Sequence, residues 1–386
     1  MVRILIIADD LTGANDSAVQ FAERGFSAAT MLLSEDGTIQ GKLPGAQVLA
    51  VSTESRNLTP ERALGLMGLV VPGLIDAFSP DVVFKKIDST LRGNPGVETQ
   101  YVSALLDKPA VIAPAYPQNG RTVRDGYLLV DGKMLSETYA ASDLLAPASS
   151  SYVPDYFSKP GMEFSVADAT TERDLDSLVE SRRRDCREVL WAGSAGLARA
   201  LAGSLTPAGP AQGAPPECHP GKGRTLVLFG SLHPAAIAQV EALHGATDCA
   251  VILPLSESGL KSLLDSFERM PESTVVVATH RVKFGPNDSV PAEAAARSMK
   301  SFFGDLAGKA ADSRRFRNMV ISGGDVAYAV LRSLDASALR ICSEILPGVA
   351  FGSVVGGRAE GMGIVTKAGG FGSDQTLKQI VVWLRQ

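Results

Sequence analysis

The sequence has few cysteines, and it lacks a hydrophobic run long enough to cross a membrane. Its four cysteines are scattered without paired spacing, so we expect neither a disulfide framework nor a zinc site. The opening residues MVRILIIADD are apolar but too short for a signal peptide, and acids follow at once. No stretch approaches the roughly 20 apolar residues of a membrane span. These absences favour a protein of the reducing cytoplasm without a membrane partner.

Three common motifs of nucleotide-binding proteins and hydrolases are also missing. Neither GxxxxGK[ST] nor GxGxxG occurs, which disfavours a P-loop NTPase and a standard dinucleotide fold. GxSxG is absent as well. WAGSAG at 191–196 approaches it, but no histidine and aspartate constellation supports a hydrolase.

The charge balance is mildly acidic, with 37 Lys and Arg against 42 Asp and Glu and a formal charge of -5. Such a chain has no general attraction for nucleic acid or anionic lipid, so we expect a small-molecule partner. The length of 386 residues and the 45% share of apolar residues suit two globular domains. A homodimer is left open.

Short β-branched runs alternate with helical patterns, which is typical of parallel sheets covered by helices. The predicted helices include Asn15–Arg24, Pro60–Phe78 after Thr59 as N-cap, and a small-residue helix from Ser194 to about Leu205. The strands predicted from such runs are Arg3–Ala8, Val48–Ser52, Val82–Lys86, Ala110–Pro114, Val189–Ala192, Thr225–Phe229, Ala250–Leu253, Thr274–Ala278, Asn318–Ile321 and Gly363–Thr366. The fold class is therefore α/β, with two domains of mainly parallel sheet and an active site in the cleft between them.

The boundary between the domains is predicted from composition. Residues 206–223, TPAGPAQGAPPECHPGKG, are too rich in proline and glycine for regular structure and read as a linker. The first domain then covers residues 1–205 and the second residues 224–386. Around the pairs Asp125-Gly126 and Asp131-Gly132 we expect a hairpin excursion from the first domain.

Two acids follow the first predicted strand. Ligands of open parallel sheets bind beyond the carboxyl ends of the strands, so Asp9 and Asp10 are candidates to orient or deprotonate a substrate hydroxyl. The alternative is that one of them only caps the following helix. We prefer Asp10 as the base and take Asp9 as the second candidate.

A second polar cluster, KKIDSTLRGNPG at 85–96, follows the strand that ends at Lys86. Hydroxyls, backbone N–H groups and lysine suit a carboxylate or phosphate, whereas a solvated turn would not explain two lysines ending a buried strand. Arg56, after another strand, falls at the same sheet edge and could complete an anion site.

Three glycine-bearing turns follow strands in the second half: FGSLHP at 229–234, SGGD at 322–325 and KAGGFG at 367–372. Glycine lets backbone amides approach phosphate oxygens closely, so three such turns at one edge favour a nucleotide site. Each turn alone is more often a tight connection. His233 is expected to cap or pack at the start of its helix.

Several motifs appear in order along nearly the whole chain: IADDLTGAND, KKIDSTLRGN, APAYPQNGRTVRDG, GSAGLA, SGGD and TKAGGFG. Together they resemble the four-carbon acid sugar kinases, which have an N-terminal sugar-acid domain and a C-terminal nucleotide domain. The resemblance implies ATP-dependent phosphorylation, with Mg²⁺, of the C4 hydroxyl of D-threonate, D-erythronate or a 3-oxo-tetronate. The AND at 14–16 looks more like the threonate kinases.

The resemblance also implies which residues bind the two ligands. Substrate contacts would fall on Asp9, Asp10, Arg56, Lys86, Ile87, Asp88 and Ser89. Nucleotide contacts would fall on Ser231, Ser322, Gly323, Gly324, Asp325, Gly369, Gly370 and Gly372. The metal ligands stay unassigned, although Asp325 could assist Mg²⁺.

Two functions of other classes remain as alternatives. A nicotinamide-dependent dehydrogenase would share the two-domain layout, but it would normally carry GxGxxG. A non-catalytic sugar-acid sensor would need only the first domain, so the glycine turns of the second argue against it.

Overall fold

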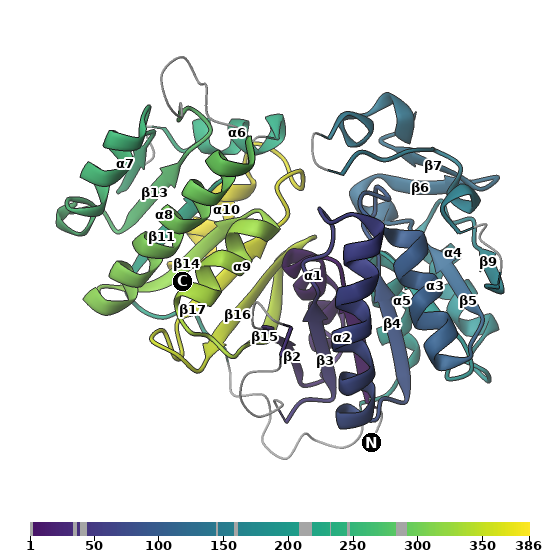
Figure 1. Ribbon diagram of the computed structural model, residues 1–386. Coiled ribbons are helices and arrows are strands. Elements are labelled where there is room, and N and C mark those ends of the chain that lie inside the picture. The colour runs from purple at the N-terminus through teal and green to yellow at the C-terminus, as the bar shows by residue number, and fades with distance from the viewer. Residues whose placement is uncertain are drawn as a thin grey trace. The chain divides into compact units, whose positions relative to one another are not determined.

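The computed structural model describes residues 3–33, 37–38, 45–143, 146–157, 161–207, 218–231, 233–244, 248–282 and 292–386. The chain divides into two compact units, Met1–Pro216 and Glu217–Gln386. Residues 208–217 of the predicted linker lie outside the described residues. Each unit has an α/β fold, so the predicted α/β class is confirmed, while the active site between the domains stays a prediction (Figure 1).

The sheet of unit 1 is parallel between all of its neighbouring strands, in the order β2-β3-β1-β4-β10-β5-β9. Its central strands are fully buried, as expected where both faces of a parallel sheet are covered. Its strands are β1 Ile4–Ala8, β2 Ala28–Met31, β3 Val48–Ser52, β4 Val82–Lys86, β5 Ala110–Ala113, β9 Phe164–Val166 and β10 Leu190–Gly193.

Helices cover both faces of this sheet. Its helices are α1 Leu11–Ala22, α2 Pro60–Phe78, α3 Pro95–Leu106, α4 Glu172–Ser181 and α5 Ala195–Ser204. Helix α5 packs against both α1 and α4, whereas α2 packs against α3, and Figure 1 shows α2 and α3 in front of the strands. Right-handed crossovers between parallel strands explain why some helices cover one face of the sheet and the others the opposite face. The chain moves one way along the sheet through α1 and the opposite way through α2 and α3.

The hairpin excursion predicted in unit 1 is confirmed. A separate antiparallel sheet contains β6 Arg121–Arg124, β7 Tyr127–Val130 and β8 Lys133–Met134. Both Asp-Gly pairs have positive φ at each residue, between 50° and 78°. This is the backbone conformation that two-residue hairpin turns require.

The sheet of unit 2 has the order β12-β13-β11-β14-β17-β16-β15. Its strands are β11 Arg224–Phe229, β12 Cys249–Ile252, β13 Thr274–Ala278, β14 Phe316–Ser322, β15 Ala338–Leu346, β16 Val349–Val355 and β17 Gly363–Lys367. The first five strands in this order run parallel, and the last two form an antiparallel hairpin beside β17. The sequence did not predict this hairpin.

The helices of unit 2 are α6 Pro234–Glu241, α7 Glu257–Leu264, α8 Ala292–Ser313, α9 Gly324–Ser333 and α10 Thr376–Trp383. Helices α8 and α9 pack together, and Figure 1 shows them in front of the strands, while α6 packs against α10. A core of apolar side chains from β11, β17, α6 and α10 lies on the α6 face. Unit 2 therefore has its own hydrophobic core.

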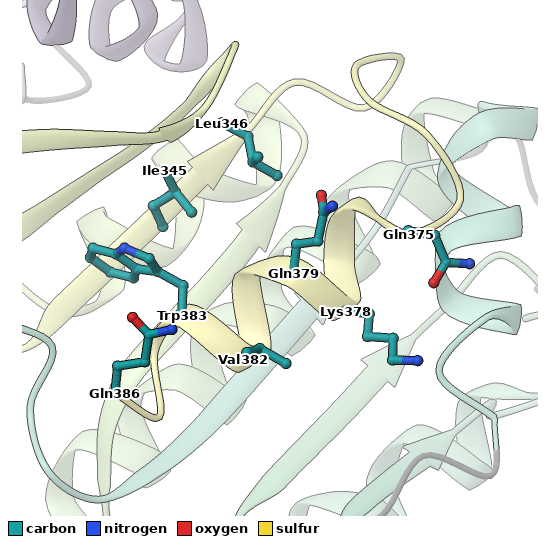
Figure 2. Close-up of a pocket in the computed structure, with 8 residues that line it drawn as sticks. All are labelled: Ile345, Leu346, Gln375, Lys378, Gln379, Val382, Trp383 and Gln386. Carbon is teal, nitrogen blue, oxygen red and sulfur yellow. The ribbon is translucent and has the colours of Figure 1, made fainter.

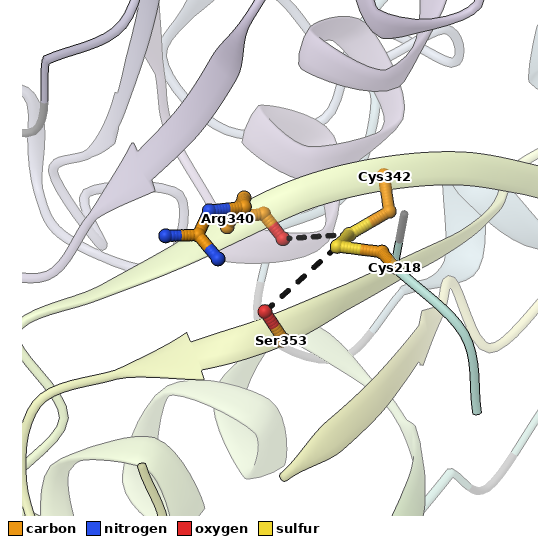
Figure 3. The surroundings of a disulfide bond; sticks show 4 residues. All are labelled: Cys218, Arg340, Cys342 and Ser353. Atoms are coloured by element: carbon orange, nitrogen blue, oxygen red, sulfur yellow. Dashed lines mark hydrogen bonds between the residues drawn. A yellow bond between two sulfur atoms is a disulfide. The ribbon is translucent and has the colours of Figure 1, made fainter. Parts of the chain in front are cut away.

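The expectation that the chain contains no disulfide is wrong. Cys218 and Cys342 form one, with Cα atoms 5.8 Å apart across a sequence separation of 124 residues. Figure 3 shows the sulfur atoms beside the Ser353 hydroxyl, 3.9 Å from Cys218 Sγ, and the Arg340 carbonyl oxygen, 3.4 Å from Cys342 Sγ. Cys342 lies on β15, one strand of the unpredicted hairpin, which explains why sequence spacing did not reveal the pair. Cytoplasmic localisation, which partly depended on this expectation, stays a prediction.

Candidate functional site

The first group of predicted site residues lies at the carboxyl ends of three neighbouring strands of unit 1. Asp9 and Asp10 follow β1, Arg56 lies in the segment after β3, and Asp88 lies in the segment after β4. The helix after β1 covers one face of the sheet, whereas the helices after β3 and β4 cover the other. The turns therefore diverge at a topological switch point, where open α/β sheets bind ligands.

The guanidinium of Arg56 lies at the centre of this group. Its Nε and Nη2 donate to the two carboxylate oxygens of Asp9, each at 2.8 Å. Its Nη1 and Nη2 donate to the two oxygens of Asp10, also at 2.8 Å each. Asp88 Oδ1 lies 3.7 Å from Nη2. Because the planar fork of arginine suits such bidentate contacts, one cation holds acids from different turns together.

Burial and charge act in opposite directions on the pKa values of this cluster. Burial lowers the pKa of Arg56, but the three carboxylates, that of Asp10 most, raise it well above its usual value. Burial raises the pKa of Asp9, but Arg56 holds it below the usual value. Burial also raises the pKa of Asp88, and Arg92 and Arg56 together hold it well below its usual value. Asp9 and Asp88 are therefore carboxylates at neutral pH.

Asp10 has a second role at the N-terminus of α1. Its Oδ1 accepts a hydrogen bond from the backbone N–H of Gly13 at 2.8 Å, and its Oδ2 accepts one from the Thr12 hydroxyl at 2.6 Å. Asp10 thus caps α1, as the alternative expected of one of the two acids, and it also contacts Arg56. Including the bonds from Arg56, its carboxylate accepts four hydrogen bonds. Within the described residues, the Asp9 carboxylate accepts hydrogen bonds from Arg56 alone, so it keeps more capacity for a hydroxyl.

The segment after β4 adds further polar groups to the same edge. Lys86, Asp88 and Ser89 are all buried. A Cβ atom at Gly13 would lie 3.1 Å from Lys86 Nζ and 2.5 Å from an oxygen of Asp10, so the lysine packs closely against the turn after β1. Ile87 is buried too, and its N–H donates to the Gly193 carbonyl at 3.0 Å, which extends the pairing of β4 with β10.

The sequence did not reveal a buried ion pair beneath this segment. Lys85 Nζ lies 2.8 Å from Glu98 Oε2, and each side chain is only 1% exposed. Glu98 also accepts a hydrogen bond from the Ser55 hydroxyl at 2.6 Å, and Lys85 donates to the Lys86 carbonyl at 2.8 Å. The pair thus connects the residue before Arg56 with the segment after β4. Glu98 lies on α3. The only sequence signal for an acidic partner was the pair of lysines at the end of β4.

The second group lies at the carboxyl ends of three neighbouring strands of unit 2. Phe229 of β11 pairs with Ser322 of β14, which in turn pairs with Lys367 of β17, so the three strands end level. The turn after β14 leads to α9, while the turns after β11 and β17 lead to α6 and α10 on the other face. This is again a topological switch point.

The three turns of unit 2 contact one another. A Cβ atom at Gly369 would collide with the Ser231 hydroxyl, and one at Gly370 would lie 3.2 Å from Nε2 of His233. Gly323 precedes α9 with φ +108°, and its N–H donates to the carbonyl of Lys367, the first residue of the turn after β17, at 3.0 Å. The structure therefore brings the predicted residues of these turns together.

Two smaller features of unit 2 concern polar side chains. The Ser322 hydroxyl is buried and makes no hydrogen bond within the described residues. Such a group requires a partner, and a ligand can supply it. His233 caps α6, because its Nδ1 accepts a hydrogen bond from the Ala235 N–H at 3.2 Å, as the sequence predicted.

A groove on unit 2 lies apart from the predicted residues. It has a volume of about 520 Å³, and Figure 2 shows its lining residues Ile345, Leu346, Gln375, Lys378, Gln379, Val382, Trp383 and Gln386. All of them come from the end of β15 and from α10 or its flanks. No predicted site residue is among them.

Two features are absent from the described residues. No described helix combines the length and apolar character needed to cross a membrane. Likewise, no group of three or more His, Cys, Asp or Glu residues that could hold a metal ion occurs in the part of the chain that the structure describes.

Comparison with known proteins finds a different family model for each part of the chain. Residues 4–163 match the family model of a sugar-binding N-terminal domain, and residues 226–377 match that of a nucleotide-binding C-terminal domain. A solved structure from Salmonella typhimurium has a TM-score of 0.77 at 23% identity, with 98% of this chain and 99% of that chain covered. At this identity the likeness concerns the fold. The two halves of the chain thus match two different domain families in turn.

Curated relatives specify the family. The D-threonate kinase of Bordetella bronchiseptica is 30% identical, with 99% of this chain and 97% of the relative covered. That of Salmonella typhimurium is 29% identical over 100% of this chain and 99% of the relative. A D-erythronate kinase of Heliobacterium modesticaldum is 27% identical, with 100% of this chain and 97% of the relative covered. A 3-oxo-tetronate kinase of Brucella melitensis is also 27% identical, with 97% of this chain and 94% of the relative covered. The chain belongs to the four-carbon acid sugar kinase family.

Proposed function

We propose that this protein transfers the γ-phosphate of ATP to the terminal C4 hydroxyl of a four-carbon sugar acid, with D-threonate as the preferred substrate. The relatives at 29% and 30% identity are D-threonate kinases, and the AND at 14–16 resembles that group. The observation that carries the proposal is the cluster of carboxylates around Arg56 at the switch point of unit 1.

This cluster has the chemistry to recognise a hydroxylated acid. Carboxylates held in their charged form accept hydrogen bonds from sugar hydroxyls, and they are strong acceptors where water is excluded. Lys86 and Ser89, which are buried at the same edge, supply donors for the substrate carboxylate and inner hydroxyls. A cation and fixed acceptors together select a small molecule that carries both an acid group and hydroxyl groups.

The chemical step requires a carboxylate at the reacting hydroxyl. The hydroxyl oxygen forms the new bond to the γ-phosphorus, the bond from that phosphorus to the bridging β–γ oxygen breaks, and ADP leaves. The hydroxyl proton passes to an aspartate. The sequence favours Asp10 as the base, but Asp9 accepts fewer hydrogen bonds in the structure. We therefore propose that the pair supplies the base and that Asp9 is the favoured member.

The turns of unit 2 supply donors for the nucleotide. Ser231, Ser322–Asp325 and the glycines at 369, 370 and 372 lie where backbone N–H groups and hydroxyls can reach phosphate oxygens. The carboxylate of Asp325 and the buried hydroxyl of Ser322 are hard oxygen ligands, which suit Mg²⁺ that arrives with the nucleotide. When bound, this ion would neutralise phosphate charge.

A panel of four-carbon acids tests the proposal. The purified protein is incubated with ATP and D-threonate, D-erythronate or a 3-oxo-tetronate, and ADP release is followed. Phosphorus NMR of the product identifies the esterified carbon. We expect D-threonate to give the highest kcat/KM and a C4 phosphate. Higher turnover of another acid would correct the substrate, whereas no ADP release with any of them would contradict the kinase and favour a sensor or a dehydrogenase.

A further inference from the structure

A lysine that the proposed mechanism does not use lies under the last glycine turn of unit 2. Lys367 ends β17, and none of its surface is exposed. Its Nζ donates hydrogen bonds to the backbone carbonyls of Ala368, Gly369 and Phe371, at 2.8, 3.2 and 2.9 Å. The ammonium therefore occupies the inside of the turn, and the main chain surrounds it.

The charge of this ammonium has no acidic partner. No carboxylate lies within ion-pair distance of it in the part of the chain that the structure describes. Burial lowers the pKa of Lys367 to about 7. A buried cation without a counter-ion is costly, so such a residue indicates a function rather than a contribution to stability.

The three carbonyl contacts determine where the N–H groups of the turn point. Across a planar trans peptide, the carbonyl of one residue and the N–H of the next point in opposite directions. Because three carbonyls point at Lys367, the following N–H groups point away from it. These belong to Gly369, Gly370 and Gly372, and none of them donates a hydrogen bond within the described residues. The turn thus presents an unpaired set of donors on its outer side.

The glycines of the turn are required by their surroundings. Besides the contact of Gly369 with Ser231, Gly372 has φ +87°, a conformation that other residues rarely adopt. A second interaction fixes the turn, since the side-chain amide of Gln239 donates to the Phe371 carbonyl at 3.0 Å. The outward direction of the N–H groups is therefore specified by the fold.

We propose that Lys367 is a positioning residue of the nucleotide site: it gathers three carbonyls from inside the turn and so directs the N–H groups of Gly369, Gly370 and Gly372 at phosphate oxygens of a bound nucleotide. This inference rests on the proposed use of ATP. Successive backbone N–H groups form anion-binding concavities, and the phosphates supply the negative charge that Lys367 lacks. Lys367 itself touches no phosphate, because the turn encloses it.

The test compares ligands with and without phosphates on the full chain. Lys367→Met keeps the length and apolar stem of the side chain but removes the donor, while Lys367→Gln keeps two N–H donors. ADP affinity is measured by calorimetry and adenosine binding by saturation-transfer NMR. We expect at least a tenfold loss of ADP affinity in Lys367→Met, a smaller loss in Lys367→Gln, and unchanged adenosine binding. KM for ATP should rise while KM for the sugar acid stays constant.

Lys378→Met serves as the matched control, because Lys378 is an exposed lysine of α10 outside the predicted site. It should bind ADP like the parent. Unchanged ADP affinity in a folded Lys367→Met protein would overturn the positioning role, and so would equal losses for ADP and adenosine. If the parent protein itself bound neither ADP nor ATP, the proposed function would fail instead, and the two failures are thus distinguished.

Discussion

Arg56, which is far from Asp9 and Asp10 in the sequence, provides the positive charge that pairs with these two buried acids. Its four short hydrogen bonds to Asp9 and Asp10 compensate two carboxylates that are each less than 10% exposed. Removing one partner of a buried ion pair typically costs about 3–5 kcal/mol, because the other charge stays buried. The same residue thus serves the fold and the proposed substrate site. A neutral substitution at Asp9 or Asp10 leaves Arg56 with two carboxylate partners, whereas loss of Arg56 would leave all three acids without it.

Substitution of the acids separates chemistry from folding. Asp9→Asn and Asp10→Asn keep the size of the side chain and one acceptor oxygen but lose the basic carboxylate. We expect each to lower kcat about a hundredfold or more, because the C4 hydroxyl loses its proton acceptor. Binding of ADP, measured by calorimetry, should stay at the parental level.

Asp76→Asn on α2 is the control for this pair, because Asp76 is an exposed acid of the same unit. It should keep parental turnover. Near-normal kcat in both Asp9→Asn and Asp10→Asn would remove the catalytic role from the turn after β1.

Lys367 makes a prediction about stability and pH. Burial lowers its pKa to about 7 from the usual value of 10.5. Below pH 7 both the folded and the unfolded chain hold the proton. Between pH 7 and 10.5 the unfolded chain binds more protons, so the free energy of unfolding rises with pH, by as much as about 1.4 kcal/mol per pH unit.

Lys367→Met removes this contribution. The free energy of unfolding of the parent minus that of the variant should therefore grow from pH 7 to pH 9.5. Urea denaturation at four pH values measures it. A difference that stays constant over this range would show that the lysine keeps an ordinary pKa.

At the scale of elements, both strands of the β15–β16 hairpin contribute residues to the surroundings of the disulfide. Cys342 lies on β15, and Ser353 on β16 lies 3.9 Å from the sulfur of Cys218. We expect two free thiols in the denatured, unreduced chain, those of Cys186 and Cys249, and four after reduction. Reduction should lower the free energy of unfolding of unit 2 by about 2–4 kcal/mol, because the unfolded chain regains entropy.

Thiol titration and denaturation in the presence and absence of reductant measure these quantities. Cys342→Ser should behave like the reduced parent. Cys249→Ser, which changes a free cysteine of the same unit, should respond to reductant as the parent does. Four reactive thiols in the unreduced chain would contradict the disulfide.

Strong local signals explain which elements the sequence predicted. β3, β4 and β13 have the predicted bounds, and so does α2, whose Thr59 cap accepts a hydrogen bond from the Arg62 N–H. Their β-branched runs and the cap are local features. The hairpin β15–β16 was missed, because half-buried residues such as those of β15 give no continuous apolar run.

The candidate sites were predictable as positions along the chain but not as contacts. The rule that ligands bind at the carboxyl ends of strands indicated the turns after β1, β4, β14 and β17. It could not indicate that Arg56 binds both acids at once or that Glu98 lies under Lys85. Nor could it reveal the contacts of Lys367. Its partners are backbone carbonyls, which every residue has, so no residue type in the sequence marks them.

At the scale of the whole molecule, each unit has its own switch point with its own set of polar groups. In unit 1 these are carboxylates gathered by an arginine, and in unit 2 they are N–H groups and hydroxyls. The first set suits a hydroxylated acid, and the second suits phosphate. This difference predicts that the two ligands bind to different units.

Hydrogen exchange can test this assignment. A non-hydrolysable ATP analogue should slow amide exchange in residues 322–325 and 367–372, whereas D-threonate should slow it in residues 9–13 and 86–89. Bound ligand raises the free energy of local opening around its own contacts. Protection of unit 2 alone by D-threonate would contradict the assignment.

The disulfide also makes part of unit 2 a closed covalent ring. Residues 218 and 342 are joined, so a force applied to the two ends of the chain passes through the sulfur–sulfur bond and bypasses the 124-residue separation between them. At roughly 3.5 Å per extended residue, the oxidised chain should release about 430 Å less contour length on mechanical unfolding than the reduced chain. The turns after β11 and β14 lie inside the ring, whereas the turn after β17 lies outside it. Optical-tweezer traces recorded with and without reductant would therefore separate the stretching of the first two turns from that of the third.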